Sequence, residues 1–340
     1  MPDPETLSQV LDAAEQRRAE RRQFLRTASV FGMAAGSSAL LAACGAGDKN
    51  KAPTPTPSSS GTATPTPTSS ATISYGPTDV FAFALNLEYL EAQFFSQAAF
   101  GKGLDATLTA GATTDVTVGT VTGGRQVSFT DAVVQQYARE IATDEKGHVT
   151  FLRTQLGTSV IAQPDINIDG GATGAFTTAA RAAGLVGSSA TFDPYASDTN
   201  FLLAAFLLED VIVTAYKGII PYVGTATLIE ATGGLQATES YHAGLIRSTL
   251  YAKGVSTASL ITGAEQISNW RDSLDGTTDD DQGIRTDVNG ASNVVPADSN
   301  GIIYQRTPPQ VLNILFMNAA TGTTKGGFFP NGVNGTITSS

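Results

Sequence analysis

Apolar side chains recur every three or four positions in four long segments of this chain. In the first segment Phe83, Leu87, Leu90 and Phe94 follow this spacing. Because an α-helix has about 3.6 residues per turn, such spacing predicts a helix with one buried face. The four segments are residues 80–100, 130–156, 200–220 and 225–252. A long connection, 158–199, separates the second from the third, so the pattern predicts an all-α four-helix bundle with one long crossover.

Residues that commonly begin or end helices stand at the borders of these segments. Asp79 is placed to cap the first helix, and Asp131 is placed to open the second. Gly157 and Pro221 stand where the second and third helices should end. The bundle is therefore expected to occupy residues 79–254.

Weaker patterns lie between and after the long segments. Residues 108–122 predict a short β-hairpin, and residues 177–183 predict a short helix. The region 255–340 is expected to be a loop-rich C-terminal extension that packs on the bundle, with one helical patch at 309–318. The Gly233-Gly234 pair is unfavourable inside a helix, so we expect it to bend the fourth helix and loosen any site there.

The N-terminal residues have the order of an export signal. Arg21 and Arg22 form a twin-arginine pair, and a run of small apolar residues follows that is short for a membrane span. The run ends in LAAC at Cys44, which resembles the lipobox of bacterial lipoproteins. We therefore expect the twin-arginine translocase to export the protein and residues 1–43 to be removed. Lipidated Cys44 would then anchor the mature chain to a membrane of the cell envelope.

A spacer follows this signal. Residues 44–78 contain almost no large apolar side chain and include the stretch KAPTPTPSSSGTATPTPTSS. Such a segment has too little apolar surface to build a core, and its Pro-Thr alternation favours an extended chain. It is expected to be a disordered linker that holds the bundle away from the lipid surface.

Composition narrows the possible chemistry. The 340 residues carry a net charge of −11, with 31 acidic against 20 basic residues, which argues against a nucleic-acid partner. A single Cys excludes a disulfide framework and any zinc site built on several cysteines. Only two His are present, so any histidine-dependent chemistry has to use these two.

Both histidines stand three residues after a glutamate. The chain contains Glu145-x-x-His148 in the second helix and Glu239-x-x-His242 in the fourth. Residues three apart point to nearly the same side of a helix, so each motif places a carboxylate beside an imidazole. In both helices that side is the apolar stripe. Each of the two helices therefore directs a pair of ligand groups toward the core.

The other two helices each carry a glutamate on an apolar face. In the third helix Glu209 shares this face with Tyr216, whereas Asp210 points elsewhere. In the first helix both Glu88 and Glu91 lie on the apolar face. An aromatic residue follows seven positions after Glu88, as it does after Glu209, and this parallel favours Glu88 while leaving Glu91 open. A buried ionised carboxylate is costly unless it is paired or binds a metal.

Glutamates from two helices and Glu-x-x-His from two others form the set that builds a di-metal carboxylate site in a helical bundle. Carboxylates and imidazoles suit two iron ions, with manganese as the alternative. Two carboxylates would bridge the metals, and each His with one remaining Glu would bind one metal. A hydrogen-bonded core network without metal is the other interpretation. The candidate ligands are Glu88, Glu145, His148, Glu209, Glu239 and His242.

A second group of carboxylates lies in the C-terminal region. Its spacing does not match the calcium-binding loop of an EF-hand, so we expect a solvated acidic loop instead of a calcium site. Trp270 nearby is expected to anchor the core. The carboxylates are Asp275, Asp279, Asp280, Asp281 and Asp287.

Several stretches carry a family resemblance. They are LNLEYLEAQFF, ATDEKGHVTFLRTQLG, FLLAAFLLEDVIVTAYKG, TESYHAGLIRSTLYAKG, ISNWRDSLDG and IIYQRTPPQVLNILF. They resemble the ferritin-like domain family that includes plant desiccation-related proteins and exported bacterial relatives. The resemblance covers most of residues 79–333 and implies a ferritin-like bundle. It also places the family's metal-ligand pattern on the six candidate ligands.

The chain departs from the family pattern at Phe95, where ferritin-like sites often carry a tyrosine near the metals. Tyr216 is then the candidate redox neighbour. The resemblance implies an exported protein with a di-iron centre and ferroxidase or peroxide-related activity. The alternative is a non-catalytic envelope protein associated with desiccation or stress. Ferritin-like folds host several activities, so the fold alone does not select one of them.

Overall fold

The computed structural model describes most of the chain after the N-terminal region. The twin-arginine pair Arg21 and Arg22, Cys44 and nearly all of the linker lie outside the described residues, as does Asp287. Within the described part, no helix is long and apolar enough to cross a membrane. The described residues are 75–113, 117–286 and 290–340.

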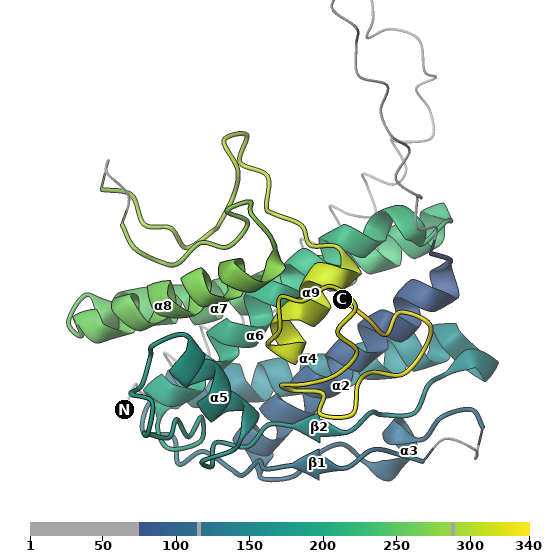
Figure 1. Cartoon of the computed structure of the whole chain (residues 1–340), viewed down its shortest axis with the longest axis horizontal. Helices are drawn as coiled ribbons and strands as arrows, with labels where there is room; N and C mark the ends of the chain where they lie inside the picture. Colours follow the sequence, from purple (N-terminus) through teal and green to yellow (C-terminus); the bar gives the residue numbers. More distant parts are fainter. Residues whose placement is uncertain (1–74, 114–116, 287–289) are drawn as a thin grey trace, which may run out of the picture. The chain divides into compact units, whose positions relative to one another are not determined.

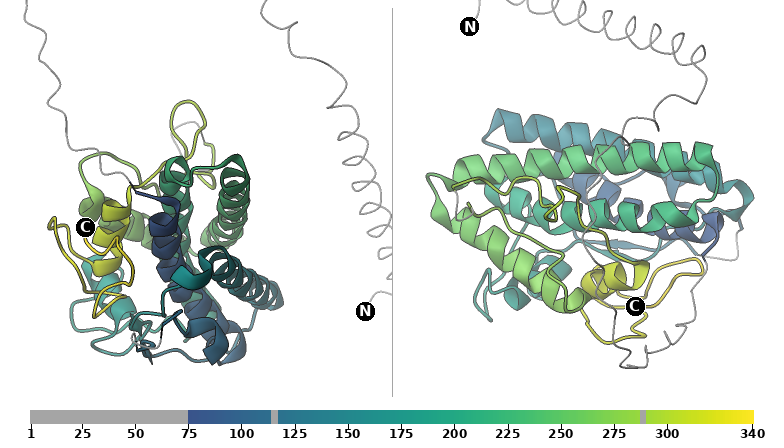
Figure 2. Two further views of the ribbon diagram at one scale, coloured as in Figure 1. Left: turned by 90° about the vertical axis from the view of Figure 1, so that its right-hand side faces the viewer. Right: turned by 90° about the horizontal axis from the view of Figure 1, so that it is seen from above.

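Four long helices form a bundle (Figures 1 and 2). α2 packs along α4, and α6 packs along α7. The two pairs meet where α2 contacts α6 and where α4 contacts α7, and a long crossover leads from α4 to α6. The all-α bundle that the hydrophobic pattern predicts is therefore confirmed. The helices are α2 (Pro77–Phe100), α4 (Ala132–Leu156), α6 (Asp198–Ile219) and α7 (Ala226–Gly254).

Two of these helices are buried on nearly all sides, and two present one stripe to the core. Every residue of α2 from Val80 to Ala99 is buried except Gln97, because this helix has almost no polar face. α6 is buried to a similar extent. α4 instead buries one stripe that includes Ile141 and Leu152, and its other faces are polar. The hydrophobic period of α4 therefore determines which of its faces points to the core, whereas α2 is enclosed by the rest of the bundle on nearly all sides.

Local signals define most helix ends, with one shift. Asp131 caps α4, and its carboxylate accepts hydrogen bonds from two backbone N–H groups of the first turn. Asp79 is not the residue that precedes α2 as predicted, because the helix begins at Pro77 and Asp79 lies in its first turn. Asp79 instead accepts a hydrogen bond of 2.8 Å from the backbone N–H of Gly76. Proline is well suited to a first helical position, where its missing N–H would have no helical partner.

The predicted hairpin is wrong. Residues 108–122 contain instead the short helix α3 (Ala106–Thr109), which begins just before them, and the strand β1 (Val121–Thr122). β1 pairs in parallel with β2 (Ile166–Asn167), which lies beyond α4 in the crossover (Figure 1). A hairpin prediction considers only neighbouring residues, so it missed this distant partner.

The crossover and the turns contain three further short helices or helical turns. The predicted helix at 177–183 is present as α5 (Ala175–Ala182). Single helical turns, η1 (Gly157–Ser159) and η2 (Ile220–Tyr222), follow α4 and α6. α7 continues as one helix across Gly233 and Gly234, each of which faces open space.

The C-terminal region contains a helix where mostly loop was expected. α8 (Ala258–Asp275) packs against α6, α7 and α9 (Pro308–Phe316), and α9 matches the predicted patch. Leu260, Ala264 and Ile267 are buried at helical spacing in α8. The polar residues between them weaken the pattern, and this explains why the helix was missed.

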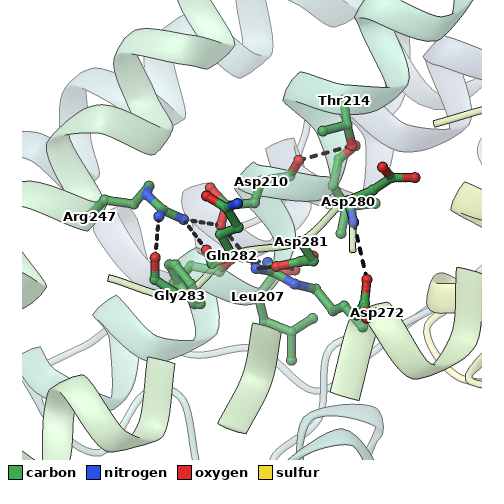
Figure 3. Close-up of polar contacts among 12 residues, drawn as sticks. Leu207, Asp210, Thr214, Arg247, Asp272, Asp280, Asp281, Gln282 and Gly283 are labelled. Atoms are coloured by element: carbon green, nitrogen blue, oxygen red, sulfur yellow. Dashed lines mark hydrogen bonds and ion pairs between the residues drawn. The ribbon is translucent and has the colours of Figure 1, made fainter. Parts of the chain in front are cut away.

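A buried network of charges connects α8 to the bundle (Figure 3). Arg247 of α7 and Arg271 of α8 both bind Asp210 of α6, with N–O distances of 2.7 and 2.9 Å. Arg271 also binds Asp281 at 2.6 Å, and Arg306 binds the second oxygen of Asp281 at 2.7 Å. Three guanidinium groups from distant parts of the chain therefore meet at the outer side of α6.

This network corrects the expectation of a solvated acidic loop for Asp275 and Asp281, whereas Asp279 is exposed as expected. Asp281 and Asp275 are only 6% and 4% exposed, and Arg306 binds Asp275 at 2.5 Å. The carboxylate oxygens of Asp281, and one oxygen of Asp275, bind guanidinium groups and do not form a calcium site. Trp270 is 8% exposed and belongs to the core, in agreement with its expected role as an anchor.

Candidate metal centre

The six predicted ligands come together in the core between the four long helices. α2 and α6 each supply one glutamate, and α4 and α7 each supply one Glu-x-x-His pair. All four glutamates are 0% exposed, His148 is 7% exposed and His242 is 2% exposed. Residues separated by most of the domain in sequence therefore share one buried site.

The first group of ligand atoms surrounds a point that we call position 1. It is formed by Glu88, Glu145, His148 and Glu239, whose facing atoms all lie within 4.8 Å of one another. Nδ1 of His148 lies 2.8 Å from Glu239, 3.3 Å from Glu88 and 3.6 Å from Glu145. Three carboxylates and one imidazole therefore face this point.

A second group surrounds a neighbouring point, position 2. It is formed by Glu145, Glu209, Glu239 and His242, again with facing atoms within 4.8 Å. Nδ1 of His242 lies 3.0 Å from Glu145, 3.5 Å from Glu239 and 4.0 Å from Glu209. Position 2 therefore has the same set of ligand types as position 1.

Two glutamates are shared between the positions. Glu145 directs Oε2 toward His148 and Oε1 toward His242. Glu239 does the reverse, with Oε1 toward His148 and Oε2 toward His242. Each of these carboxylates therefore has one oxygen at each position, which is the arrangement of a bridging ligand.

The ligand atoms fit a pair of metal ions. Apart from the contacts between imidazole and carboxylate given above, both oxygens of Glu145, Glu209 and Glu239 are buried without a hydrogen-bond partner in the described structure, as are Nδ1 of His148 and of His242. Leaving a buried polar atom unpaired costs about 1–3 kcal/mol, and charged groups cost more. Two divalent cations would balance the charge of the four carboxylates in the two groups. The combination of carboxylate oxygen and imidazole nitrogen suits iron or manganese.

Burial and neighbouring charges shift the pKa values of the clustered residues. Burial, together with the charges of neighbouring carboxylates, raises the pKa of Glu88 and of Glu209 well above the usual value. Burial acts in the same direction on Glu145, but its contacts with the two imidazoles outweigh burial and lower its pKa. For His242 burial lowers the pKa, yet Glu145 and Glu239 outweigh it and raise the pKa to about 12. The surrounding carboxylates therefore favour the protonated form of the His242 imidazole.

Sequence reasoning missed one residue at this site. The carboxylate of Asp144 lies 3.2 Å from Nε2 of His242, the ring nitrogen that faces away from position 2. A carboxylate behind a ligand histidine fixes the ring and increases its basicity. No residue in the described structure plays this role for Nε2 of His148. The signal was present, because Asp144 directly precedes Glu145 in the sequence ATDEKGH.

Tyr216 lies beside position 1. Its hydroxyl donates a hydrogen bond to Oε1 of Glu88, and the other oxygen of Glu88 faces His148. Burial and the charge of Glu88 raise the pKa of Tyr216 well above its usual value. Phe95 instead packs in an aromatic cluster against Phe94 and Phe201, with ring centroids 5.0 and 5.9 Å away.

Glu91, the alternative first-helix ligand, is also buried in the core. It is 0% exposed but belongs to neither group of clustered ligand atoms. Of the two glutamates on this helix, Glu88 is therefore the one that completes a position.

The chain has sequence similarity to known proteins. The profile of the Ferritin-like domain family matches residues 76–252. The chain is 30% identical to the ferritin-like catalase Nec2 of Nesocodon mauritianus, over 76% of this chain and 84% of that protein. It is 32% identical to the desiccation-related protein PCC13-62 of Craterostigma plantagineum, over 68% of this chain and 74% of that protein. No solved structure matches the chain significantly.

Proposed function

Because the chain belongs to the ferritin-like domain family, we propose that positions 1 and 2 hold a di-iron centre that breaks down hydrogen peroxide. Manganese is the alternative metal. The observation that carries the proposal is the pair Glu145 and Glu239, buried carboxylates that each direct one oxygen to position 1 and the other to position 2. The similarity to a protein named ferritin-like catalase favours peroxide as the substrate.

The protein residues would position and isolate the reaction. Glu145 and Glu239 would hold the two metals at a fixed separation, and each histidine with one further glutamate would bind one metal. Two such metals would supply the two-electron exchange that reduces one peroxide to water and oxidises a second to dioxygen. Tyr216 holds Glu88 in place by its hydrogen bond. The apolar core of α2 and α6 keeps bulk water away from the site.

Metal analysis combined with an oxygen electrode tests this proposal. The exported form of the protein is expected to bind two metals per chain and to release dioxygen from added peroxide. Glu145→Gln removes a shared ligand and should lower both the metal content and the activity. Glu140→Gln is the matched control, because Glu140 lies on the exposed side of the same helix and should behave as the unmodified protein. A purified protein that contains no transition metal, and takes up none under anaerobic conditions, would contradict the proposal.

The similarity to a desiccation-related protein supports a second candidate function. In this alternative the protein protects the cell envelope during drying or stress without catalysis. It predicts that the double variant Glu145→Ala/His148→Ala folds normally and still supports survival after drying. Loss of survival with an intact fold would favour the metal-dependent function instead.

We also propose that the protein is exported and lipid-anchored, on the basis of the sequence order of Arg21, Arg22 and Cys44. Cys44→Ser should release the protein from the membrane fraction. Replacing both arginines by lysine should retain it in the cytoplasm. Unchanged fractionation of both variants would show that these residues have no such role.

A further inference from the structure

Glu91 is a buried carboxylate for which the protein itself supplies no partner. It lies on α2, one turn after Glu88, and is 0% exposed. Neither of its oxygens has a hydrogen-bond partner anywhere in the described residues. Outside the cluster of ligand atoms, the buried acid Asp281 is instead paired with Arg271 and Arg306. Because buried polar groups in native proteins have a hydrogen-bond or metal partner, we look for the partner of Glu91 outside the polypeptide.

The surroundings of Glu91 place it on the side of position 2. Three residues of α-helix advance by about 4.5 Å, which is comparable to the separation of the two sites. The two histidine rings, one at each position, have centroids 6.1 Å apart. α2 and α6 run in opposite directions, because Phe94 of α2 stacks on Phe201 near the start of α6, whereas Glu88 binds Tyr216 near the end of α6. The step from Glu88 to Glu91 along α2 therefore leads away from Tyr216 and toward Glu209, which belongs to position 2 alone. Glu91 thus lies closer than Glu88 to the level of position 2.

The other half of the bundle has no equivalent of Glu91. Glu88 of α2 and Glu209 of α6 have matching places, since each belongs to one position only. Three residues after Glu209 stands Ile212, a buried apolar residue. The extra carboxylate is therefore present on one helix only, and it makes the two positions unequal.

We propose that Glu91 is a seventh ligand that binds metal at position 2, and that position 2 consequently binds metal more tightly than position 1. This inference rests on the di-metal centre proposed above. No hydrogen bond holds the Glu91 carboxylate in its present orientation, so its side chain can turn toward a bound metal. Position 1 has no such additional ligand and is the position left open to substrate.

A cobalt titration of the metal-free protein tests the inference without any activity measurement. Co²⁺ binding is followed anaerobically by calorimetry and by the visible absorption of the metal. The unmodified protein should bind two ions in two steps. Glu91→Gln keeps the size of the side chain but is a weaker ligand, so it should weaken the tighter step by about tenfold or more and leave the other unchanged. Glu88→Gln should instead weaken the second step.

Each outcome separates this inference from the proposed function. If the unmodified protein binds no cobalt, the metal centre itself is wrong. If it binds two ions and Glu91→Gln has the same two affinities, the centre stands but Glu91 is not a ligand. An equal loss in both steps would also overturn the assignment, because a general structural defect acts on both positions. Melting of the metal-free variant, with Glu91→Asp as a conservative replacement expected to restore part of the tight binding, checks the fold.

Discussion

Replacing Asp144 by alanine is predicted to weaken metal binding at position 2 without affecting position 1. The Asp144 carboxylate lies 3.2 Å from Nε2 of His242, and its side chain is 43% exposed. A hydrogen bond to a charged group contributes about 1.5–3 kcal/mol when it is well buried. Partial exposure reduces this to about 1–2 kcal/mol, which corresponds to a loss of about five- to thirtyfold in affinity. The Co²⁺ titration described above measures this change directly.

The other half of the bundle offers a matched control for this prediction. Thr238 precedes Glu239 as Asp144 precedes Glu145, but its hydroxyl donates to the backbone oxygen of Gly234 at 3.2 Å. Thr238→Ala should therefore leave both affinities unchanged. Thr238→Asp places a carboxylate at the equivalent point behind His148 and is predicted to strengthen position 1.

Two results would refute this reasoning. One is an Asp144→Ala protein that binds both metals like the unmodified protein. The other is an equal loss of affinity in Thr238→Ala, which would show that the change acts on the helix and not on the orientation of a histidine.

Three further predictions concern stability. Arg306→Met should lower the free energy of unfolding in urea by about 3–5 kcal/mol, because it leaves the buried carboxylates of Asp275 and Asp281 without this partner. Arg125→Met is the control: it removes an exposed ion pair and should lower the free energy of unfolding by less than about 1 kcal/mol. Gly218→Ala should lower the melting temperature, because a Cβ there would lie 1.9 Å from a backbone oxygen. Gly147 lies in a helix and faces open space, so Gly147→Ala should raise the free energy of unfolding by up to about 1 kcal/mol. The pKa of Asp281 is lowered in the folded protein, because the adjacent guanidinium groups outweigh the opposing effect of burial. The stabilisation from this carboxylate is therefore present above its unfolded pKa of about 4 and is lost as the pH falls below that value. Urea unfolding of Asp281→Asn should show a weaker dependence on pH in that range.

The bundle and the six clustered residues were predictable because each depends on local spacing. The stripe of α4 is a period of three or four residues, and the Glu-x-x-His motifs lie on it. Glu209 and Glu88 were recognisable because a carboxylate on an apolar helix face is costly to bury unless it is paired or binds a metal. Such features are properties of single helices, which a sequence displays directly.

Features that depend on contacts between distant segments were missed. The partner of β1 lies beyond α4, and Asp210 of α6 meets Arg271 of α8 and Arg306 only in the folded chain. The acidic region around Asp281 looked solvated because its partners are far away in sequence. The Gly233-Gly234 pair, which was expected to bend the fourth helix, lies inside α7, and the helix continues across it.

The two halves of the bundle supply matching ligands, yet three residues make the positions unequal, and all three act in the same direction. As proposed above, Glu91 would add a carboxylate at position 2, and Asp144 lies 3.2 Å from Nε2 of His242 there. Tyr216 donates a hydrogen bond to Glu88, which withdraws negative charge from the ligand of position 1. A centre built in this way would hold one metal firmly and keep the other position accessible.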